Sequence, residues 1–161
     1  MAKQKKTSER DKPKKLAEAL LLRADLLRKI EQLQNRIRPV LIVSDDKQPQ
    51  EDPAKLMAQL RKAIQDLEAL VVKINTTNNT TVVPGYGNLM QALARRDALK
   101  MLSEKLRTIR YAAQINNSGE KVLKTTIDIK KLQAEIDQTG RDFRALDSTI
   151  QEINWSTIIK D

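Results

Sequence analysis

The chain of 161 residues contains neither cysteine nor histidine. Without cysteine it can form no disulfide framework, and without either residue it lacks the usual ligands of zinc, haem and iron–sulfur clusters. A metal ion would have to bind carboxylates alone, and the sequence carries no calcium-loop pattern. We therefore expect neither a metal nor a cofactor.

Glycine, proline and aromatic residues are scarce as well. The sequence has four Gly, five Pro and 2% aromatic residues, while 32% of its residues are charged. This composition leaves few turns and is typical of a small number of long helices. Phosphate-binding glycine loops, nucleophile elbows and Ser/Lys dyads are absent from the sequence, so we expect no catalytic residue and a non-enzymatic protein.

Long hydrophobic runs are missing. The longest apolar cluster, Leu16 to Leu27, is interrupted by three charged residues and is shorter than the roughly 20 apolar residues of a membrane span. The first 15 residues also lack the apolar core of a secretory signal. We expect a cytoplasmic chain without a transmembrane helix.

Positive charge is concentrated at the N-terminus. The net charge is +9, and residues 1–15 contribute +5 of it. One interpretation is a solubilising disordered tail over residues 1–13, and the other is a tail that binds nucleic acid or an acidic surface. The basic residues of this segment are Lys3, Lys5, Lys6, Arg10, Lys12, Lys14 and Lys15.

Apolar residues recur at steps of three and four from Ile129 to Ile153, which predicts a long helix with one coiled-coil-like seam. Asp128 is placed to cap its first turn. Three further helices are expected: Lys14 to Arg38, a second that begins at Asp52-Pro53 and ends in the Asn75–Thr81 tract, and a third capped by Asn88 with Gln91. The seam of the second helix comprises Leu56, Leu60, Ala63, Leu67, Leu70 and Ile74, flanked by Met57, Ile64 and Val71.

The first helix has an apolar arc too broad for one neighbour to cover. Leu16, Leu20, Leu27, Ile30 and Ile37 share a face, and further leucines widen it on both sides. Either this helix is central in the fold or a second subunit covers its outer edge. The chain is therefore expected to form a homo-oligomer.

Short extended segments are expected between the helices. Thr81–Val83 precedes a turn at Pro84–Gly87, and Val40–Val43 is either a strand fragment or a hydrophobic turn. The alternation from Leu123 to Ile129 predicts a strand, paired with one of those two segments or with another subunit. The predicted fold is mainly α: an elongated four-helix antiparallel bundle over residues 14–161, with one or two short strands near one end.

Two groups of polar residues are candidate sites. Arg23 and Arg96 fall among apolar positions, where Asp25, Asp97 or Asp147 can pair with them. Such pairs either fix helix register or form a small site for an anionic ligand. The second group is a possible recognition patch, for which the alternative is that the asparagines are caps and the tryptophan packs the last helix. Its members are Asn75, Asn78, Asn154 and Trp155.

Several strings, in order and at matching distances from Lys15 to Trp155, resemble the small bacterial helical proteins often labelled septicolysin. They are Lys15–Leu20 with Arg23–Asp25, Ile74-Asn75 with Thr77-Asn78, Ala92–Ala94 with Arg96-Asp97 and Leu99, Asp128 with Leu132-Gln133, and Leu146-Asp147 with Ile150–Glu152 and Asn154-Trp155. The resemblance implies a bacterial helical protein of unestablished activity, and the label implies a cytolysin. The chain departs from the pattern at Ala145, where an acidic residue is usual. It departs again in Asn116–Lys121, which keeps Glu120 but lacks the basic residues expected around it.

The sequence thus favours a structural or interaction protein that self-associates through the arc of Leu16–Leu33 and through the 122–127 strand. The alternative function is nucleic-acid or acidic-surface binding through the N-terminal tail. The membrane-active lysin implied by the septicolysin label is the third, disfavoured hypothesis, because a helical pore needs a hairpin apolar enough to insert.

Overall fold

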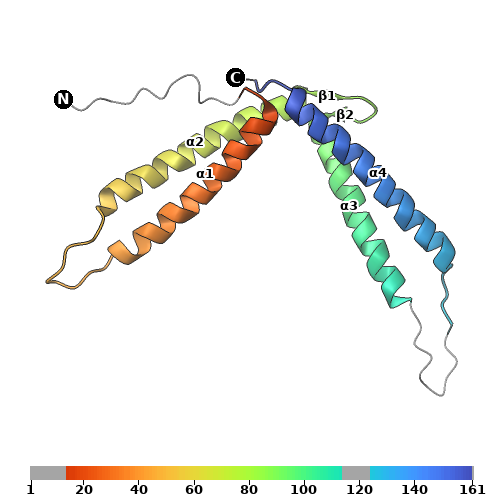
Figure 1. Cartoon of the computed structure of the whole chain (residues 1–161), viewed down its shortest axis with the longest axis horizontal. Coiled ribbons are helices and arrows are strands. Elements are labelled where there is room, and N and C mark those ends of the chain that lie inside the picture. Colours follow the sequence, from red (N-terminus) through yellow and green to blue (C-terminus); the bar gives the residue numbers. More distant parts are fainter. Residues whose placement is uncertain (1–13, 114–123, 161) are drawn as a thin grey trace, which may run out of the picture. The chain divides into compact units, whose positions relative to one another are not determined.

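A computed structural model describes residues 14–113 and 124–160 (Figure 1). The fold is mainly helical with one small antiparallel sheet, as predicted. Its elements are α1 (Leu16–Ile37), the 3-10 helix η2 (Arg38–Val40), α2 (Pro53–Thr80), β1 (Val82–Val83), β2 (Gly87–Asn88), α3 (Leu89–Ala112) and α4 (Ile129–Ser156). The described residues form two compact units. Unit 1 contains residues 14–80 and 154–160, and unit 2 contains residues 81–113 and 124–153.

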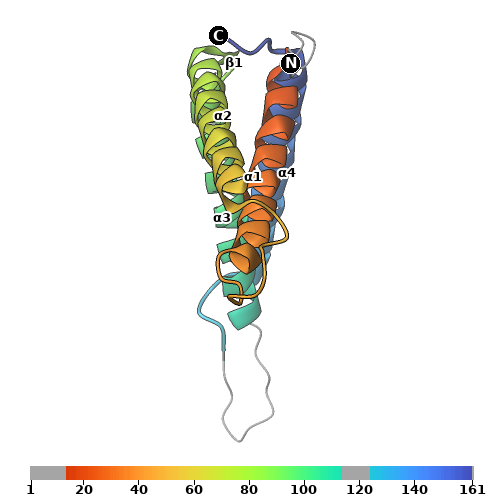
Figure 2. The ribbon, with the colours of Figure 1, turned by 90° about the vertical axis from the view of Figure 1, so that its left-hand side faces the viewer.

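Unit 1 is built on the antiparallel hairpin of α1 and α2, which lie side by side in both views (Figures 1 and 2). Near the connecting loop, Leu33, Ile37 and Val40 pack against Leu56 and Ala63. The predicted seam of α2 is confirmed in part, because four of its six residues are buried and Leu60 and Leu67 are half-buried. The buried residues of α2 are Leu56, Ala63, Leu70, Ile74 and, outside the predicted seam, Thr77.

The ends of unit 1 meet through main-chain hydrogen bonds. The amide of Leu16 donates to the carbonyl of Thr157 at 2.9 Å, and the amide of Ile159 donates to the carbonyl of Lys14 at 3.0 Å. These bonds form an antiparallel bridge around Lys15. We call this pairing of residues 14–16 with 157–159 the terminal clasp.

Acidic caps begin α2 and α4 as predicted. One carboxylate oxygen of Asp52 accepts hydrogen bonds from the amides of Ala54 and Lys55, at 2.9 and 3.3 Å. Asp128 binds the amides two and three residues further on in the same way. These amides have no partner within the helix, so each cap satisfies donors that would otherwise remain free.

In unit 2 the predicted turn forms a tight hairpin. Val82 pairs with Asn88 and Val83 with Gly87, and the two glycines of the turn have φ values of +79° and +85°, which favour glycine. Asn88 then caps α3: its side chain accepts from the amide of Gln91, whose side chain accepts from the amide of Asn88, both at 2.9 Å. The predicted capping box is confirmed.

The predicted seam of α4 is confirmed over most of its length. It packs on α3 beside Leu106, while Phe143 and Ile153 are half-buried. Its buried members are Leu132, Ile136, Thr139, Leu146 and Ile150.

One predicted strand was wrong, and the structure decides between the two interpretations of another segment. The strand from Leu123 to Ile129 is absent over residues 124–128, which form a bend leading to the Asp128 cap, and residues 122–123 lie outside the described residues. Val40 ends a 3-10 turn with its side chain buried, while Ile42 is 89% exposed. Of the two interpretations of Val40–Val43, the hydrophobic turn is therefore correct.

The second helix ends inside the predicted Asn75–Thr81 tract, but only near the end of that tract. The helix continues through it to Thr80. Its threonine hydroxyls donate to carbonyls one turn back, as Thr77 does to Lys73 at 2.8 Å and Thr80 to Thr76 at 2.9 Å. The hydroxyl groups therefore form hydrogen bonds within the helix, and most of the tract remains helical.

Replacing Asn88 with alanine should reduce the free energy of unfolding by about 1 kcal/mol, because the first turn of α3 loses its cap. Chemical denaturation followed by circular dichroism measures the change. Asn88→Ser keeps an acceptor and should recover most of the loss. Equal losses in the two variants would show that the cap contributes nothing.

Candidate functional site

The structure brings together three of the five residues in the predicted ion-pair cluster. In unit 2, Arg96 of α3 lies 2.7 Å from Asp97 and 3.6 Å from Asp147 of α4. The side chain of Arg96 is 25% exposed, so the pair with Asp147 is partly shielded from water. This geometry matches the structural interpretation, in which the arginine fixes the register of two helices.

The other two members lie on α1 in unit 1 and do not form the predicted contact. Asp25 pairs with Arg28, one turn further along the same helix. Arg23 is exposed, because the buried stripe of α1 follows Ala19, Leu33 and Ile37. The predicted buried face of α1 was centred too far toward Leu20 and Leu27. Because the Arg23 side chain is exposed to water, it needs no acidic partner.

The predicted recognition patch divides into buried and exposed residues. Asn154 is 8% exposed, whereas Trp155 is 52% exposed, so the tryptophan does not pack against the core. Asn75 and Asn78 lie inside α2, because the helix continues past both, so they are not caps. The contact that joins α2 to the C-terminal segment uses a residue missed from the sequence: Thr77 accepts from the amide of Lys160 at 3.0 Å.

Of the basic tail, only Lys14 and Lys15 lie within the described residues. Their amides donate to the carboxylate of Glu18 at 2.7 and 3.2 Å. These hydrogen bonds from Lys14 and Lys15 lower the pKa of Glu18. The start of α1 is therefore fixed by main-chain contacts, and both lysine side chains remain exposed.

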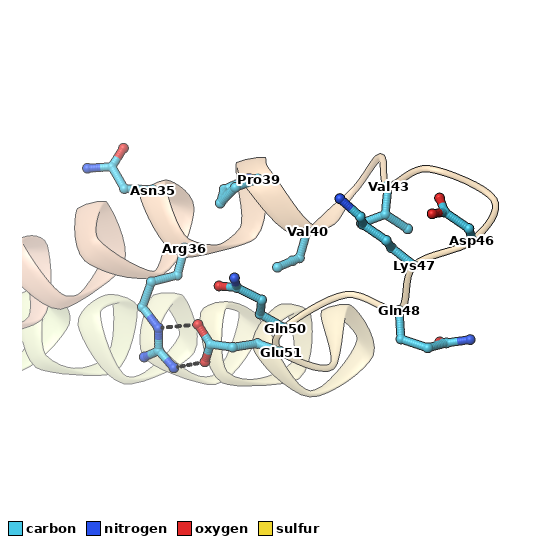
Figure 3. Close-up of a pocket in the computed structure, with 10 residues that line it drawn as sticks. All are labelled: Asn35, Arg36, Pro39, Val40, Val43, Asp46, Lys47, Gln48, Gln50 and Glu51. Carbon is cyan, nitrogen blue, oxygen red and sulfur yellow. Dashed lines mark hydrogen bonds and ion pairs between the residues drawn. The ribbon is translucent and has the colours of Figure 1, made fainter.

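A pocket of about 720 Å³ lies in the connection between α1 and α2. Arg36 extends from α1 to the carboxylate of Glu51 (Figure 3), with its Nε 3.1 Å from Oε1 and a second bond from Nη2. The pair joins residues 15 positions apart, so helical spacing could not reveal it. The Glu51 carboxylate and the Arg36 guanidinium neutralise each other, so the geometry indicates that this pair holds the end of the loop against α1. We call the pair the clamp.

The clamp makes stability depend on pH. The hydrogen bond from Arg36 lowers the pKa of Glu51 from its ordinary value of 4.5. A carboxyl group whose pKa is lowered in the folded state stabilises that state above its ordinary pKa, and this contribution disappears as the pH falls through the lowered value. Asp52 acts in the same direction, because the amides of Lys55 and Ala54 lower its pKa.

We expect Glu51→Gln to lower the melting temperature slightly at pH 7, with the difference from the wild type disappearing in acid. The pair is exposed, so the effect is small. Thermal melts from pH 7 to pH 2.5 measure it, with Glu31→Gln on α1 as the control for loss of one exposed carboxylate. A pH-independent difference would contradict the assigned role of Arg36.

One side of the unit 1 hairpin carries an apolar face, which we define as Leu20, Leu27, Met57, Ile64 and Val71. The three α2 residues recur at intervals of seven beside the buried stripe. Ile64 is 48% exposed and Leu27 is 44% exposed, and the other members are half-buried. At about 100° per residue, the α1 and α2 members lie on the same side of an antiparallel pair.

Charges of opposite sign border this face on α2. Arg61 and Glu68 are exposed and follow Met57 and Ile64 by four residues each. In helix pairs, such flanking positions carry the charges that set partner choice and orientation. The face therefore has both an apolar row and a charged border.

Two further features are absent from residues 14–113 and 124–160. No helix in these ranges is long and apolar enough to cross a membrane. No group of three or more acidic side chains within them could hold a metal ion.

Comparison with known proteins supports the fold. A crystal structure of a functionally unknown conserved protein from Corynebacterium diphtheriae matches with a TM-score of 0.83 and 27% sequence identity, over 91% of this chain and 98% of that chain. A family described as "Family of unknown function (DUF6847)" matches residues 23–159. No curated protein matches the sequence significantly. The matched residues include all of α2, α3 and α4.

Proposed function

The chain belongs to the family of unknown function DUF6847, and we propose that it is a non-enzymatic structural or interaction protein that self-associates through the apolar face of its α1–α2 hairpin. The observation that carries the proposal is the row Met57–Ile64–Val71, which continues a heptad pattern on a surface exposed to water. A row of this kind is typical of a helix that packs against a further helix.

A second copy of the chain is the partner that fits this face. Two antiparallel helices are half of a four-helix bundle, and a second hairpin of equal length completes it. Ile64 is the midpoint of the α2 row, so a two-fold axis near it would bring Met57 of one copy close to Val71 of the other. A surface that is complementary to itself in this way suits a symmetric dimer.

The charged border supports the same arrangement. A two-fold axis passing between Ile64 and Gln65 would place Arg61 of one copy opposite Glu68 of the other, and the reverse pair would form by symmetry. Opposite charges at such positions favour this orientation, while like charges would oppose it. The charges on α2 therefore support an antiparallel contact between copies.

Ile64→Glu should convert the assembly to monomers, raising the dissociation constant by about 30-fold or more, because it places a charge at the centre of an apolar contact. Sedimentation velocity at micromolar concentrations measures the change. Ala69→Glu is the matched control: Ala69 is exposed on the same helix and, at about 100° per residue, points well away from the row. A wild-type monomer, or equal dissociation in both variants, would contradict the proposal.

Charge reversal tests the two-fold axis directly. Arg61→Glu or Glu68→Arg alone should weaken the dimer, because each places like charges opposite each other, and the double reversal should restore it. All three variants alter exposed residues, so their melting temperatures in dilute solution should match. Failure of the double variant to recover association would exclude this axis.

Binding of nucleic acid through the basic N-terminal tail is the alternative function, supported by the charge of +5 on residues 1–15. If the tail binds, deletion of residues 1–13 should abolish association with duplex DNA, and the wild-type affinity should fall steeply with salt. Fluorescence anisotropy measures both. Binding that survives the deletion would assign the interaction to the helical units.

The lytic activity implied by the resemblance to septicolysin-labelled proteins is the disfavoured hypothesis, and we expect none. Dye release from lipid vesicles by the purified protein would test it. This result is independent of the oligomeric state, so it does not affect the test of the apolar face.

A further inference from the structure

Unit 2 contains a groove of about 280 Å³ between α3 and α4. Lys100 and Arg107 line it from α3, at an interval of seven residues, and Arg144 lines it from α4. The buried residues Ser103 and Gly140 also line it, together with Phe143. The groove therefore combines an interior of small and aromatic residues with cations from two helices.

Arg144 lies next to Gly140 in the groove. A Cβ atom built on this glycine would lie 3.4 Å from Nη1 of Arg144, so the guanidinium group lies close over the glycine. Gly140 occupies a buried helical position. Because it has no side chain, the guanidinium lies close to the backbone of α4 at this point of the groove.

The three cations form no ion pair with another residue in the described part of the chain. By contrast, Arg96 on the same helix as Lys100 and Arg107 pairs with two carboxylates. Glu104 is the one acidic residue lining the groove. With three positive side chains and one negative one, the groove has a formal charge of +2.

We propose that this groove binds a phosphate monoester group. A phosphate monoester carries about −1.5 to −2 charges at pH 7, which matches the charge of the groove. Two guanidinium groups supply the forked donors that suit phosphate oxygens, and Lys100 supplies a third cation. Phe143 provides an apolar contact for the organic part of the ester.

The carboxylate of Glu104 would repel a bound phosphate group, and its removal is the clearest test of the proposed site. It lies four residues after Lys100 and three before Arg107, within reach of both on the helix surface. A bound phosphate group would have to compete with this carboxylate. Removal of its charge should therefore tighten binding, an effect that a merely structural role for these residues would not produce.

Isothermal titration calorimetry with phenyl phosphate, and with inorganic phosphate for comparison, tests the groove in the full chain. We expect Arg107→Gln and Arg144→Gln each to weaken binding by about tenfold, since each removes charge-assisted hydrogen bonds. Glu104→Gln should tighten it. Lys105→Gln is the matched control, because Lys105 is exposed on α3 outside the groove.

Vesicles of phosphatidylcholine with 20% phosphatidic acid distinguish a lipid headgroup from a free ester. Binding of either probe that is lost in Arg107→Gln and kept in Lys105→Gln supports the proposal and identifies the source of the phosphate. No binding to the wild type at millimolar probe, or equal weakening by Lys105→Gln, overturns it. Melting curves confirm that each variant is folded, and Glu104→Gln tests the groove without removing a cation.

Discussion

Two packed helices can bury only part of each other's surface, and unit 1 depends on this constraint. Each helix of an antiparallel pair hides one stripe of side chains, and α1 and α2 carry apolar residues over a wider arc than that. Near the loop the stripe is well covered by Leu33, Ile37 and Leu56. Further along, Leu27 and Ile64 remain nearly half exposed. The same residues that favour hairpin formation therefore leave a surface suited to a further helix.

Local sequence signals predicted the elements well. The Asp52 and Asp128 caps, the Asn88–Gln91 capping box and the heptad seams of α2 and α4 each involve residues within a few positions of one another. Their geometry follows from helix repeat and from the donors left free at helix ends. The mainly α fold class follows from these signals together with the scarcity of glycine and proline.

Features that depend on long-range contacts were not predictable in this way. The pairing of Arg36 with Glu51 depends on the path of a loop, and the pairing of Thr77 with Lys160 spans 83 positions. The face of α1 was centred wrongly because many leucines surround that helix and only its partner decides which are buried. The alternation at Leu123–Ile129 suggested a strand. Its last residue but one, Asp128, is instead the cap of α4, and residues 124–128 pair with no other strand in the described part of the chain.

The two candidate surfaces differ in chemistry and in location along the chain. The apolar face in unit 1 is suited to protein contact, whereas the groove in unit 2 is lined by unpaired cations around buried Ser103 and Gly140. Arg96 and Asp147 hold α3 and α4 together beside the residues that line the groove. Each surface is therefore supported by helix packing that does not require the other.

The terminal clasp has a consequence for the order of events on the ribosome. Unit 1 is discontinuous in sequence, because residues 157–160 pair with residues 14–16 and with Thr77. The α1–α2 hairpin can form early, but its open end acquires these hydrogen bonds only after the whole of unit 2 has been translated and α4 has emerged from the exit tunnel. A nascent chain stalled before residue 157 would therefore carry an incomplete first unit, which chaperones and proteases could distinguish from the finished one.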